Sequence, residues 1–231
     1  MPGERPRAVL LDLDGTLMDT APDLAEAVNR MRADLGLPWL PASRVAQFVG
    51  KGADVLVHRS LTDRIDGQVE PERFVPARAA FARHYHAVNG QASVVFEGVP
   101  QALERLRARR WRLACVTNKP REFTVPLLER SQLARYMDAV VCGDEVGRGK
   151  PHPDIVLEAC RRLAVAPARA VMVGDSVNDA RAARAAGVRV LLVQTGYNEG
   201  EPLSSLSGEP GVDAIVPGLS EAVLWLDRAA S

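Results

Sequence analysis

Residues 7–16 read RAVLLDLDGT, and this stretch decides the fold. Its apolar run ends in carboxylates and a glycine, which is typical of a buried parallel strand whose C-terminal end opens onto a site. Three later runs repeat the pattern: WRLACV (111–116) leads into TNK, AVVC (139–142) into GDE and AVMV (170–173) into GDS. Residues 188–193 predict a fifth strand and residues 214–216 a weak sixth. Polar side chains are therefore expected together at one edge of a sheet.

Helical patterns separate these runs. Residues 153–163 place Val156, Cys160 and Leu163 on one face. Residues 177–186 are rich in alanine and run up to a glycine, a common stop signal. Strands that alternate with helices form right-handed βαβ units and a sheet covered on both faces. We therefore predict an α/β fold, a doubly wound and mainly parallel sheet with a Rossmann-like core.

The segment after the first strand is the exception, because the next strand begins only near residue 111, much further on than one crossover requires. Leu24, Val28, Met31 and Leu35 form one apolar stripe of a helix, and residues 77–88 predict another helix. We interpret this segment as an inserted helical cap over the strand ends. The predicted domains are a catalytic core of residues 1–18 and 93–231, and a cap of residues 19–92.

The composition excludes several classes of partner. The chain has 231 residues, 47% apolar and 25% charged, with no net formal charge. Nucleic-acid binding through phosphate contacts requires a broad basic face, which this balance does not predict. No apolar run approaches the roughly eighteen residues that span a bilayer, and the start MPGERPR lacks a signal-peptide core. We expect a cytoplasmic protein, monomer or homodimer, with a small-molecule partner and neither nucleic acid nor membrane.

The small number of lysines and the wide spacing of the cysteines bear on function. Lys51, Lys119 and Lys150 are the only lysines beside 26 arginines. Where any surface cation would serve, this chain uses arginine, so each lysine is a candidate for specific chemistry. The three cysteines stand far apart, without a CxxC pair or histidines at metal-ligand spacing, and we interpret them as buried thiols.

The strand ends carry the groups that phosphoryl transfer requires. Asp12 and Asp14 stand two residues apart where the first strand ends, so both can face one pocket. An Asp-Gly turn after a strand is common by itself. The other ends supply a hydroxyl and amides in TNK, a point cation in GKP, and two more carboxylates where a helix begins in GDSVND. Together these are a nucleophile, a hard oxygen site for a divalent cation, and donors for the phosphate oxygens.

DLDGT, the threonine of VTNK, the lysine of GKPHPD and GDSVND have the order and spacing of the four motifs of the haloacid dehalogenase superfamily, which the chain resembles. It is most similar to bacterial phosphoglycolate phosphatases, through DLDGTLMDTAPDLAEAVN, VGKGADVL, VTNKP and GDSVNDARAARAAG. The insertion corresponds to the family's helical cap. The resemblance implies a Mg2+-dependent phosphomonoesterase that converts 2-phosphoglycolate to glycolate and phosphate through an aspartyl phosphate. The motifs determine the chemistry and the cap determines the substrate.

The resemblance also implies roles for individual residues. Asp12 would attack phosphorus, and Asp14 would serve first as the acid for the leaving alkoxide and then as the base for water. The ligands of Mg2+ would be a carboxylate oxygen of Asp12, the main-chain carbonyl of Asp14 and the side chain of Asp175. Thr117 and the amides near Asn118 would bind the transferring oxygens, and the metal and Lys150 would offset their charge.

Supporting roles follow for two further residues. Asp179 would orient Lys150 or a metal-bound water, although a first-turn acid of a helix would have the same sequence pattern. Thr16 is assigned a supporting role, since such a residue is often a turn or cap hydroxyl. The sequence does not decide whether the side chain of Lys119 lies in the site or in solvent. Relatives with the GKP motif can hold the Lys150–Pro151 bond cis, and both isomers stay open here.

In the predicted cap, Lys51 stands between two glycines in VGKGAD. The segment is too short for a Walker phosphate loop. It is either a flexible turn between helices or a specificity loop that brings Lys51 to the far end of the substrate, where a cation would favour a carboxylate.

Rival functions keep the same core. A phosphatase of a sugar or amino-sugar phosphate, or a phosphosugar mutase, would differ only in the cap, and a phosphonoacetaldehyde hydrolase would use a cap lysine as a Schiff base. Haloacid dehalogenases have no need of a metal or of an acid two residues after the nucleophile. A phospho-aspartate receiver switch is the non-enzyme alternative, and the insertion and the DxD spacing count against it. A dinucleotide-binding oxidoreductase lacks its GxGxxG here.

Overall fold

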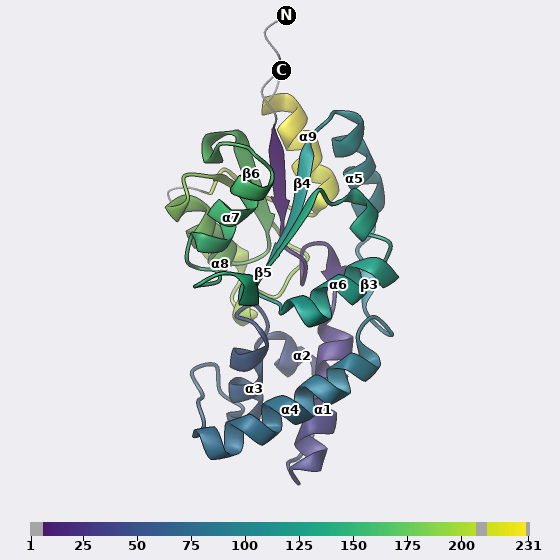
Figure 1. Ribbon diagram of the computed structural model, residues 1–231, viewed down its shortest axis with the longest axis vertical. Coiled ribbons are helices and arrows are strands. Elements are labelled where there is room, and N and C mark those ends of the chain that lie inside the picture. Colours follow the sequence, from purple (N-terminus) through teal and green to yellow (C-terminus); the bar gives the residue numbers. More distant parts are fainter. Residues whose placement is uncertain (1–6, 207–211, 230–231) are drawn as a thin grey trace, which may run out of the picture.

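The structure, a computed structural model, describes residues 7–206 and 212–229 (Figure 1). Residues 1–6, 207–211 and 230–231 of the predicted core lie outside the described part. A six-stranded parallel sheet has the order β5-β4-β1-β6-β7-β8. Its strands are β1 (Ala8–Leu11), β4 (Arg112–Thr117), β5 (Ala139–Cys142), β6 (Ala170–Gly174), β7 (Arg189–Val193) and β8 (Ala214–Val216). The predicted doubly wound sheet is confirmed, and each strand lies within one residue of its expected ends.

Both faces of the sheet are covered by helices (Figure 1). Val9 and Leu11 of β1 face one core cluster, with α5 (Val99–Ala108), α6 (Arg121–Arg130) and α9 (Leu219–Ala229), whereas Ala8 and Leu10 face the other, with α7 (Asp154–Arg162) and α8 (Val177–Ala185). Successive side chains of a strand point to opposite faces, so a strand buried on both sides consists of a continuous apolar run. Short 3-10 helices complete the core: η1 (Ala134–Tyr136), η2 (Gly143–Glu145), η3 (Pro167–Arg169), η4 (Asn198–Gly200) and η5 (Leu203–Leu206).

The strand order reverses beside β1, because the chain adds β4 and β5 on one side and β6, β7 and β8 on the other. At such a switch point the loops at the carboxyl ends of the strands diverge and leave a crevice, which is where α/β sheets bind ligands. Asp12 follows β1 directly, and its main-chain N–H donates to the carbonyl of Val173 at 3.0 Å. The backbone thereby continues the strand pairing up to the crevice.

Four helices form a second layer below the strand ends (Figure 1). They are α1 (Ala21–Asp34), α2 (Ala42–Ala46), α3 (Ala53–Thr62) and α4 (Pro71–Val88). Their apolar side chains make a separate cluster, which Phe123 of α6 joins. The helix expected at residues 77–88 begins earlier, at Pro71, and continues through Pro76. A proline inside a helix removes a backbone hydrogen bond, and the sequence did not show that burial of Ala77, Ala80 and Phe81 offsets this loss.

The chain enters and leaves this layer through neighbouring segments. β2 (Met18–Asp19) and β3 (Val94–Val95) pair antiparallel. Neither of these short strands was predicted from the sequence. Asp23, 1% exposed, accepts hydrogen bonds from the main-chain N–H groups of Gly90, Ala92 and Ser93. A buried carboxylate needs such donors, so Asp23 ties the two connections together.

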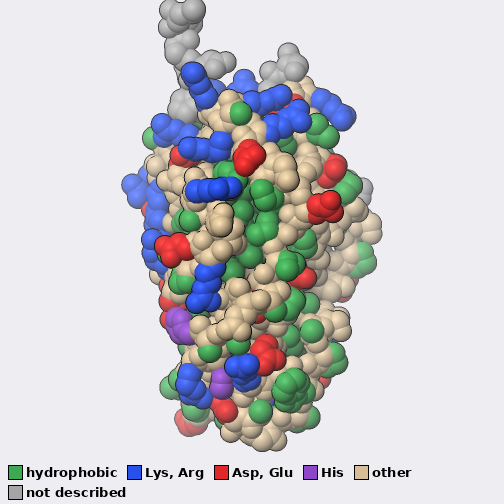
Figure 2. All heavy atoms as spheres, turned by 90° about the vertical axis from the view of Figure 1, so that its right-hand side faces the viewer, with side chains coloured by type: hydrophobic (Ala, Val, Ile, Leu, Met, Phe, Trp, Pro, Cys, Tyr) green, Lys and Arg blue, Asp and Glu red, His purple; other side chains and the backbone are tan. Residues whose placement is uncertain are grey.

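Charged side chains of both signs share the surface. Figure 2 shows lysine and arginine side chains gathered toward the upper end of this view, with carboxylates among them. Arg105 pairs with Asp227 and Arg107 with Asp138. Within residues 7–206 and 212–229, no helix combines the length and the apolar character needed to cross a membrane.

Candidate active site

Asp12 and Lys150 form a buried ion pair at the centre of the crevice. Lys150 Nζ lies 2.8 Å from Asp12 Oδ1, and both residues are under a tenth exposed. The same oxygen accepts the main-chain N–H of Leu13 at 2.7 Å. Burial raises the pKa of Asp12 to about 7, with Lys150 acting in the opposite direction. Because Oδ1 already contacts Lys150 and accepts the N–H of Leu13, Oδ2 is the oxygen that remains for a ligand.

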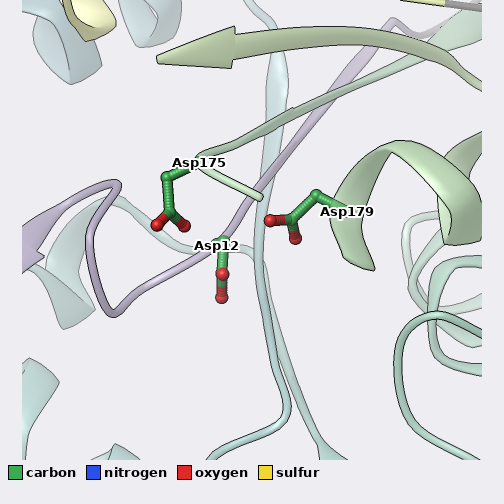
Figure 3. A group of neighbouring side chains, drawn as sticks. All are labelled: Asp12, Asp175 and Asp179. Carbon is green, nitrogen blue, oxygen red and sulfur yellow. The ribbon is translucent and has the colours of Figure 1, made fainter. Parts of the chain in front are cut away.

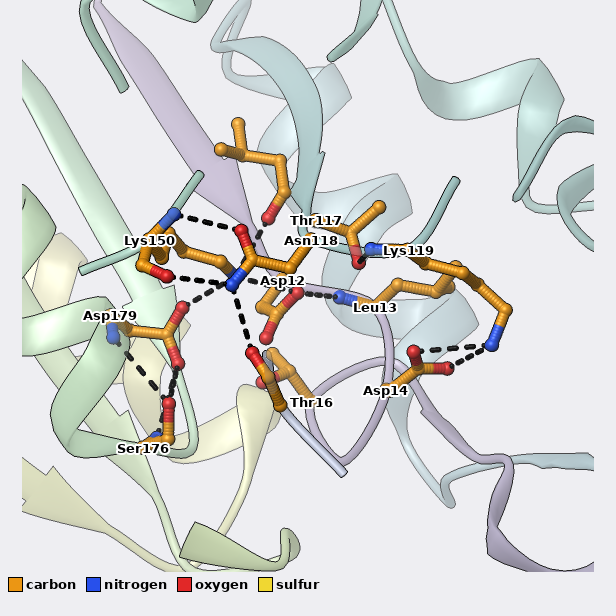
Figure 4. A network of polar contacts seen from close by, with 12 residues as sticks. Asp12, Leu13, Asp14, Thr16, Thr117, Asn118, Lys119, Lys150, Ser176 and Asp179 are labelled. Carbon is orange, nitrogen blue, oxygen red and sulfur yellow. Dashed lines mark hydrogen bonds and ion pairs between the residues drawn. The ribbon is translucent and has the colours of Figure 1, made fainter. Parts of the chain in front are cut away.

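Asp179 fixes the lysine from the other side. Lys150 Nζ also donates to Asp179 Oδ1 at 2.7 Å and to the carbonyl of Val116 at 3.0 Å, which uses all three ammonium protons (Figure 4). Asp179 Oδ2 accepts the hydroxyl and the main-chain N–H of Ser176, the N-cap of α8. Both readings of Asp179 from the sequence therefore describe its position: it is a first-turn acid and it contacts Lys150.

Asp175 completes an acidic cluster. Asp12, Asp175 and Asp179 point toward one another from β1, β6 and the start of α8 (Figure 3), with ligand atoms within 4.8 Å of one another. Burial raises the pKa of Asp175 well above its usual range, and the charges of Asp179 and Asp12 raise it further. Thr16 Oγ1 donates to Asp175 Oδ1 at 3.3 Å, and the main-chain N–H of Tyr197 donates to Oδ2 at 2.9 Å.

The cluster fits a divalent cation by charge and by donor type. When all three carboxylates are ionised, they face one ammonium group, and a divalent cation would balance the two remaining negative charges. Carboxylate oxygens are the hard ligands that Mg2+ prefers. Asp179 is bound by the charged ammonium of Lys150 and by Ser176, whereas Asp175 accepts one hydrogen bond from a neutral donor at each oxygen and Asp12 keeps Oδ2, so Asp12 and Asp175 are the side chains better placed to hold the ion.

Asp14 faces the layer of α1–α4 and pairs with the second lysine. Lys119 Nζ lies 2.9 Å from Asp14 Oδ1, and the hydroxyl of Thr20 donates to the same oxygen at 2.6 Å. Lys119 is 5% exposed, so the open choice between site and solvent is resolved: it is buried in the site. Burial opposes its charged form, yet Asp14 raises the pKa of Lys119 above its usual value.

Thr117 is the last residue of β4, and Asn118 follows it. Thr117 is 2% exposed, and its hydroxyl accepts the main-chain N–H of Lys119 at 3.2 Å. The Asn118 amide group donates to the carbonyls of Lys150 and Gly50 and accepts the N–H of Lys150 (Figure 4). The side chain of Asn118 thus joins the two core loops to the α2–α3 connection. The Lys150–Pro151 bond is cis.

One pocket joins these elements. It is bounded by Asp12, Asp14, Thr117 and Lys119 of the core and by side chains of α1, α3, α4 and the α2–α3 connection. Lys51 is not among its lining residues. Its ammonium lies 3.0 Å from Glu199 in the loop after β7, and its side chain is 36% exposed. A contact between Lys51 and the substrate stays a prediction.

Sequence reasoning did not identify Tyr85 or Tyr197 as residues of this region. Tyr85 is a buried aromatic on α4, which the helical pattern could not distinguish from core. Tyr197 lies in a loop without any motif, and its hydroxyl donates to Asp19 at 2.6 Å and accepts the N–H of Thr20 at 2.9 Å. The only sequence signal was the rarity of lysine, which marked Lys119 without placing it.

Comparisons with known proteins place the chain among relatives of known family. Residues 6–187 match the family model described as haloacid dehalogenase-like hydrolase. The phosphoglycolate phosphatase of Nitrosospira multiformis is 44% identical over 224 residues, 97% of each chain. The plasmid phosphoglycolate phosphatase of Cupriavidus necator is 48% identical over 214 residues, 92% of this chain and 89% of its own. A crystal structure described as a predicted phosphoglycolate phosphatase from Haemophilus somnus superposes with a TM-score of 0.87 at 28% identity, covering 99% of this chain and 100% of its own.

Proposed function

The chain belongs to the haloacid dehalogenase-like hydrolases, and from that premise we propose that it is a Mg2+-dependent phosphatase that hydrolyses 2-phosphoglycolate to glycolate and phosphate. The resemblance inferred from the four motifs is thereby confirmed at the level of the family. One observation carries the proposal: Asp12 and Asp14 line the same pocket, one ion-paired with Lys150 and the other with Lys119.

Asp12 and Asp14 divide the chemistry between them. The carboxylate of Asp12 attacks phosphorus while the bond to the ester oxygen breaks, and Asp14, in its protonated form, donates a proton to the departing alkoxide. The product of this step is an aspartyl phosphate on Asp12 and free glycolate. Asp14, now a carboxylate, takes a proton from water as the water attacks phosphorus. Inorganic phosphate leaves and the Asp12 carboxylate is regenerated.

The neighbouring groups offset charge in both steps. Lys150 lies against Asp12 and brings a positive charge to the equatorial oxygens, and Thr117 offers its hydroxyl. Asp179 positions Lys150, and Thr16 positions Asp175. Mg2+, held by Asp12, Asp175 and the carbonyl of Asp14, would act as a Lewis acid that neutralises the phosphate dianion. Removal of one such preorganised donor typically costs about 3 kcal/mol of barrier.

We further propose that residues 19–92 act as a cap that supplies one wall of the pocket. Leu24, Val49, Gly50 and Phe81 line it opposite Asp12. The three cysteines are free and buried, which suits a reducing compartment such as the cytoplasm. No lysine of the cap lines the pocket, and a phosphonoacetaldehyde hydrolase would require one there.

A substrate panel tests the proposed function. Purified protein with Mg2+ is assayed with 2-phosphoglycolate, hexose phosphates, amino-sugar phosphates, phosphonoacetaldehyde and p-nitrophenyl phosphate. We expect the highest kcat/KM for 2-phosphoglycolate and loss of all activities in Asp12→Asn. A higher kcat/KM for a sugar phosphate would transfer the assignment to that ester.

A further inference from the structure

The hydroxyl of Tyr85 is a buried donor that lacks an acceptor. The residue is 1% exposed, and within the described part of the chain no acceptor binds its proton, because the polar group that interacts with it, the ammonium of Lys119, is itself a donor. The ring is fixed by Phe81, stacked at 5.4 Å, and by Phe123, edge-on at 4.9 Å. A buried hydroxyl that lacks a hydrogen bond costs about 1–3 kcal/mol, so a ligand that supplies an acceptor would recover this energy. Burial raises the pKa of Tyr85, which keeps the proton on the oxygen.

Lys119 faces the same pocket as Tyr85. Its ammonium lies 4.8 Å from the centre of the Tyr85 ring, a cation–π contact. It donates to both carboxylate oxygens of Asp14, at 2.9 and 3.2 Å, and it also interacts with the hydroxyl of Tyr85. Because these neighbours engage its protons, Lys119 contributes its positive charge to a ligand at this wall of the pocket.

The beginning of α3 adds a third set of donors. Gly52 and Ala53 line the pocket, and Gly52 caps α3 without a side-chain hydrogen bond. The first N–H groups of a helix have no partner within the helix, and the positive end of its dipole favours an anion. α3 has 10 residues, which is long enough for the peptide dipoles to add up to a positive potential at its N-terminus.

We propose that Tyr85, Lys119 and the N-terminus of α3 form the subsite for a carboxylate on the leaving group. This inference rests on the proposed phosphatase function and specifies its substrate class as small carboxyalkyl phosphates. The ammonium of Lys119 and the N–H groups of the helix can only donate, and the hydroxyl of Tyr85 has a proton to donate, so the set suits an anion. The remaining walls at Leu24, Leu56 and Phe81 are apolar, so an anion there depends on these donors.

The geometry also limits the length of the leaving group. Asp14 protonates the ester oxygen in the proposed mechanism, and Lys119 Nζ lies 2.9 Å from Asp14. A group that binds Lys119 is therefore within a few bonds of the ester oxygen. A carboxylate on the adjacent carbon meets this condition, and the distal hydroxyls of a hexose do not.

Tyr85→Phe is the sharpest variant, because it removes one oxygen and keeps the ring that packs on Phe81 and Phe123. We compare 2-phosphoglycolate with ethyl phosphate, which has the same chain length and no carboxylate. A hydrogen bond to a charged group is worth about 1.5–3 kcal/mol, so kcat/KM for 2-phosphoglycolate should fall roughly 10- to 100-fold. For ethyl phosphate it should change less than about twofold. Lys119→Met should remove the same preference for the carboxylate ester. It should also slow the hydrolysis of both esters, because Asp14 loses its ion-pair partner.

Tyr136→Phe is the matched control. The Tyr136 hydroxyl donates to Glu104 at 3.0 Å, and the residue does not line the pocket. Both kcat/KM values should match those of the wild type. Thermal unfolding of each variant separates a folding defect from a binding defect.

Inhibition by glycolate gives a second readout that does not need turnover of 2-phosphoglycolate. With p-nitrophenyl phosphate as substrate, glycolate should inhibit the wild type more strongly than ethylene glycol, and its Ki should rise at least about tenfold in Tyr85→Phe. Equal losses on both esters with an unchanged Ki would overturn the subsite and leave the phosphatase assignment intact. A raised Ki without any turnover of 2-phosphoglycolate would uphold the subsite and overturn the proposed substrate.

Discussion

Glu199 and Lys51 form an ion pair across the two layers, with Lys51 Nζ 3.0 Å from Glu199 Oε1. The same carboxylate oxygen lies 3.2 Å from Nη2 of Arg59, which is 3% exposed. Glu199 belongs to the loop that also carries Tyr197, whose N–H holds Asp175. The loop after β7 therefore connects the acidic cluster to the layer of α1–α4, and Lys51 contributes to that connection.

This pairing leads to a prediction for Lys51 that differs from a substrate contact. Lys51→Ala should lower kcat/KM for 2-phosphoglycolate and for p-nitrophenyl phosphate by the same small factor, about two- to fivefold, since a partly exposed ion pair contributes about 0.2–1 kcal/mol. Glu199→Gln should lower both further, because it also leaves the charge of buried Arg59 without its carboxylate partner. Arg64→Ala, which breaks the exposed Arg64–Asp66 pair, is the control. A loss confined to 2-phosphoglycolate would restore Lys51 as a substrate contact.

Gly52 provides a test of the contact between the α2–α3 connection and the core. A Cβ at Gly52 would lie 2.9 Å from the carbonyl oxygen of Asn118, and φ is +86°. Gly52→Ala should push the connection away from the pocket and lower kcat/KM roughly tenfold or more for every ester. Gly36 also has a positive φ, +68°, with nothing within 4 Å of an added Cβ. Gly36→Ala should therefore cost stability and leave kcat/KM unchanged, and equal activity of the two variants would contradict the role of this contact.

The sheet and the groups at its strand ends could be predicted because they depend on local pattern. An apolar run buried on both faces, followed by polar residues, is visible in the sequence without knowledge of the remainder of the fold. The position of Lys119 depends on Tyr85, 34 residues earlier on another layer, and no local pattern encodes that contact. The same holds for Lys51, whose partner Glu199 lies in a loop that follows β7. Residues between the layers were thus the least predictable part of the site.

Removal of the carboxylate of Asp175 should raise the Mg2+ requirement. Asp175→Asn keeps the acceptor for the N–H of Tyr197 and loses one negative charge from the acidic cluster. The Mg2+ concentration for half-maximal activity should rise at least about tenfold, and the stabilisation of the fold by Mg2+ in thermal unfolding should weaken in parallel. Asp66→Asn, on the exposed Arg64–Asp66 pair, should change neither. An unchanged Mg2+ dependence in Asp175→Asn would remove Asp175 from the metal site.

The three cysteines should be unreactive in the folded protein. Cys115, Cys142 and Cys160 are each at most 2% exposed, and burial raises the pKa of Cys142 to about 12 and of Cys160 to about 11. Only the thiolate attacks a disulfide reagent, so labelling at pH 8 should be at least about two hundredfold slower than in unfolded chains, where a thiol pKa is near 8.5. Raising the pH toward 11 should speed the reaction of the folded protein. Full labelling within minutes at pH 8 would show that these thiols are accessible.

The two carboxylates of the DxD pair should fail in different ways. Asp12→Asn should abolish both phosphoenzyme formation and turnover, because an amide is a poor nucleophile even in an intact pocket. Asp14→Asn keeps Asp12, Lys150 and the main-chain carbonyl of residue 14, and removes the proton donor and acceptor. With p-nitrophenyl phosphate, whose leaving group needs little protonation, it should release up to one equivalent of nitrophenol and then stall, since no base activates water. With 2-phosphoglycolate even the first step should be slow, because the alkoxide needs the acid. Rapid-quench measurements with both esters distinguish the steps, and full steady-state activity of Asp14→Asn, or acid-stable label on a residue other than Asp12 in the wild type, would overturn the mechanism.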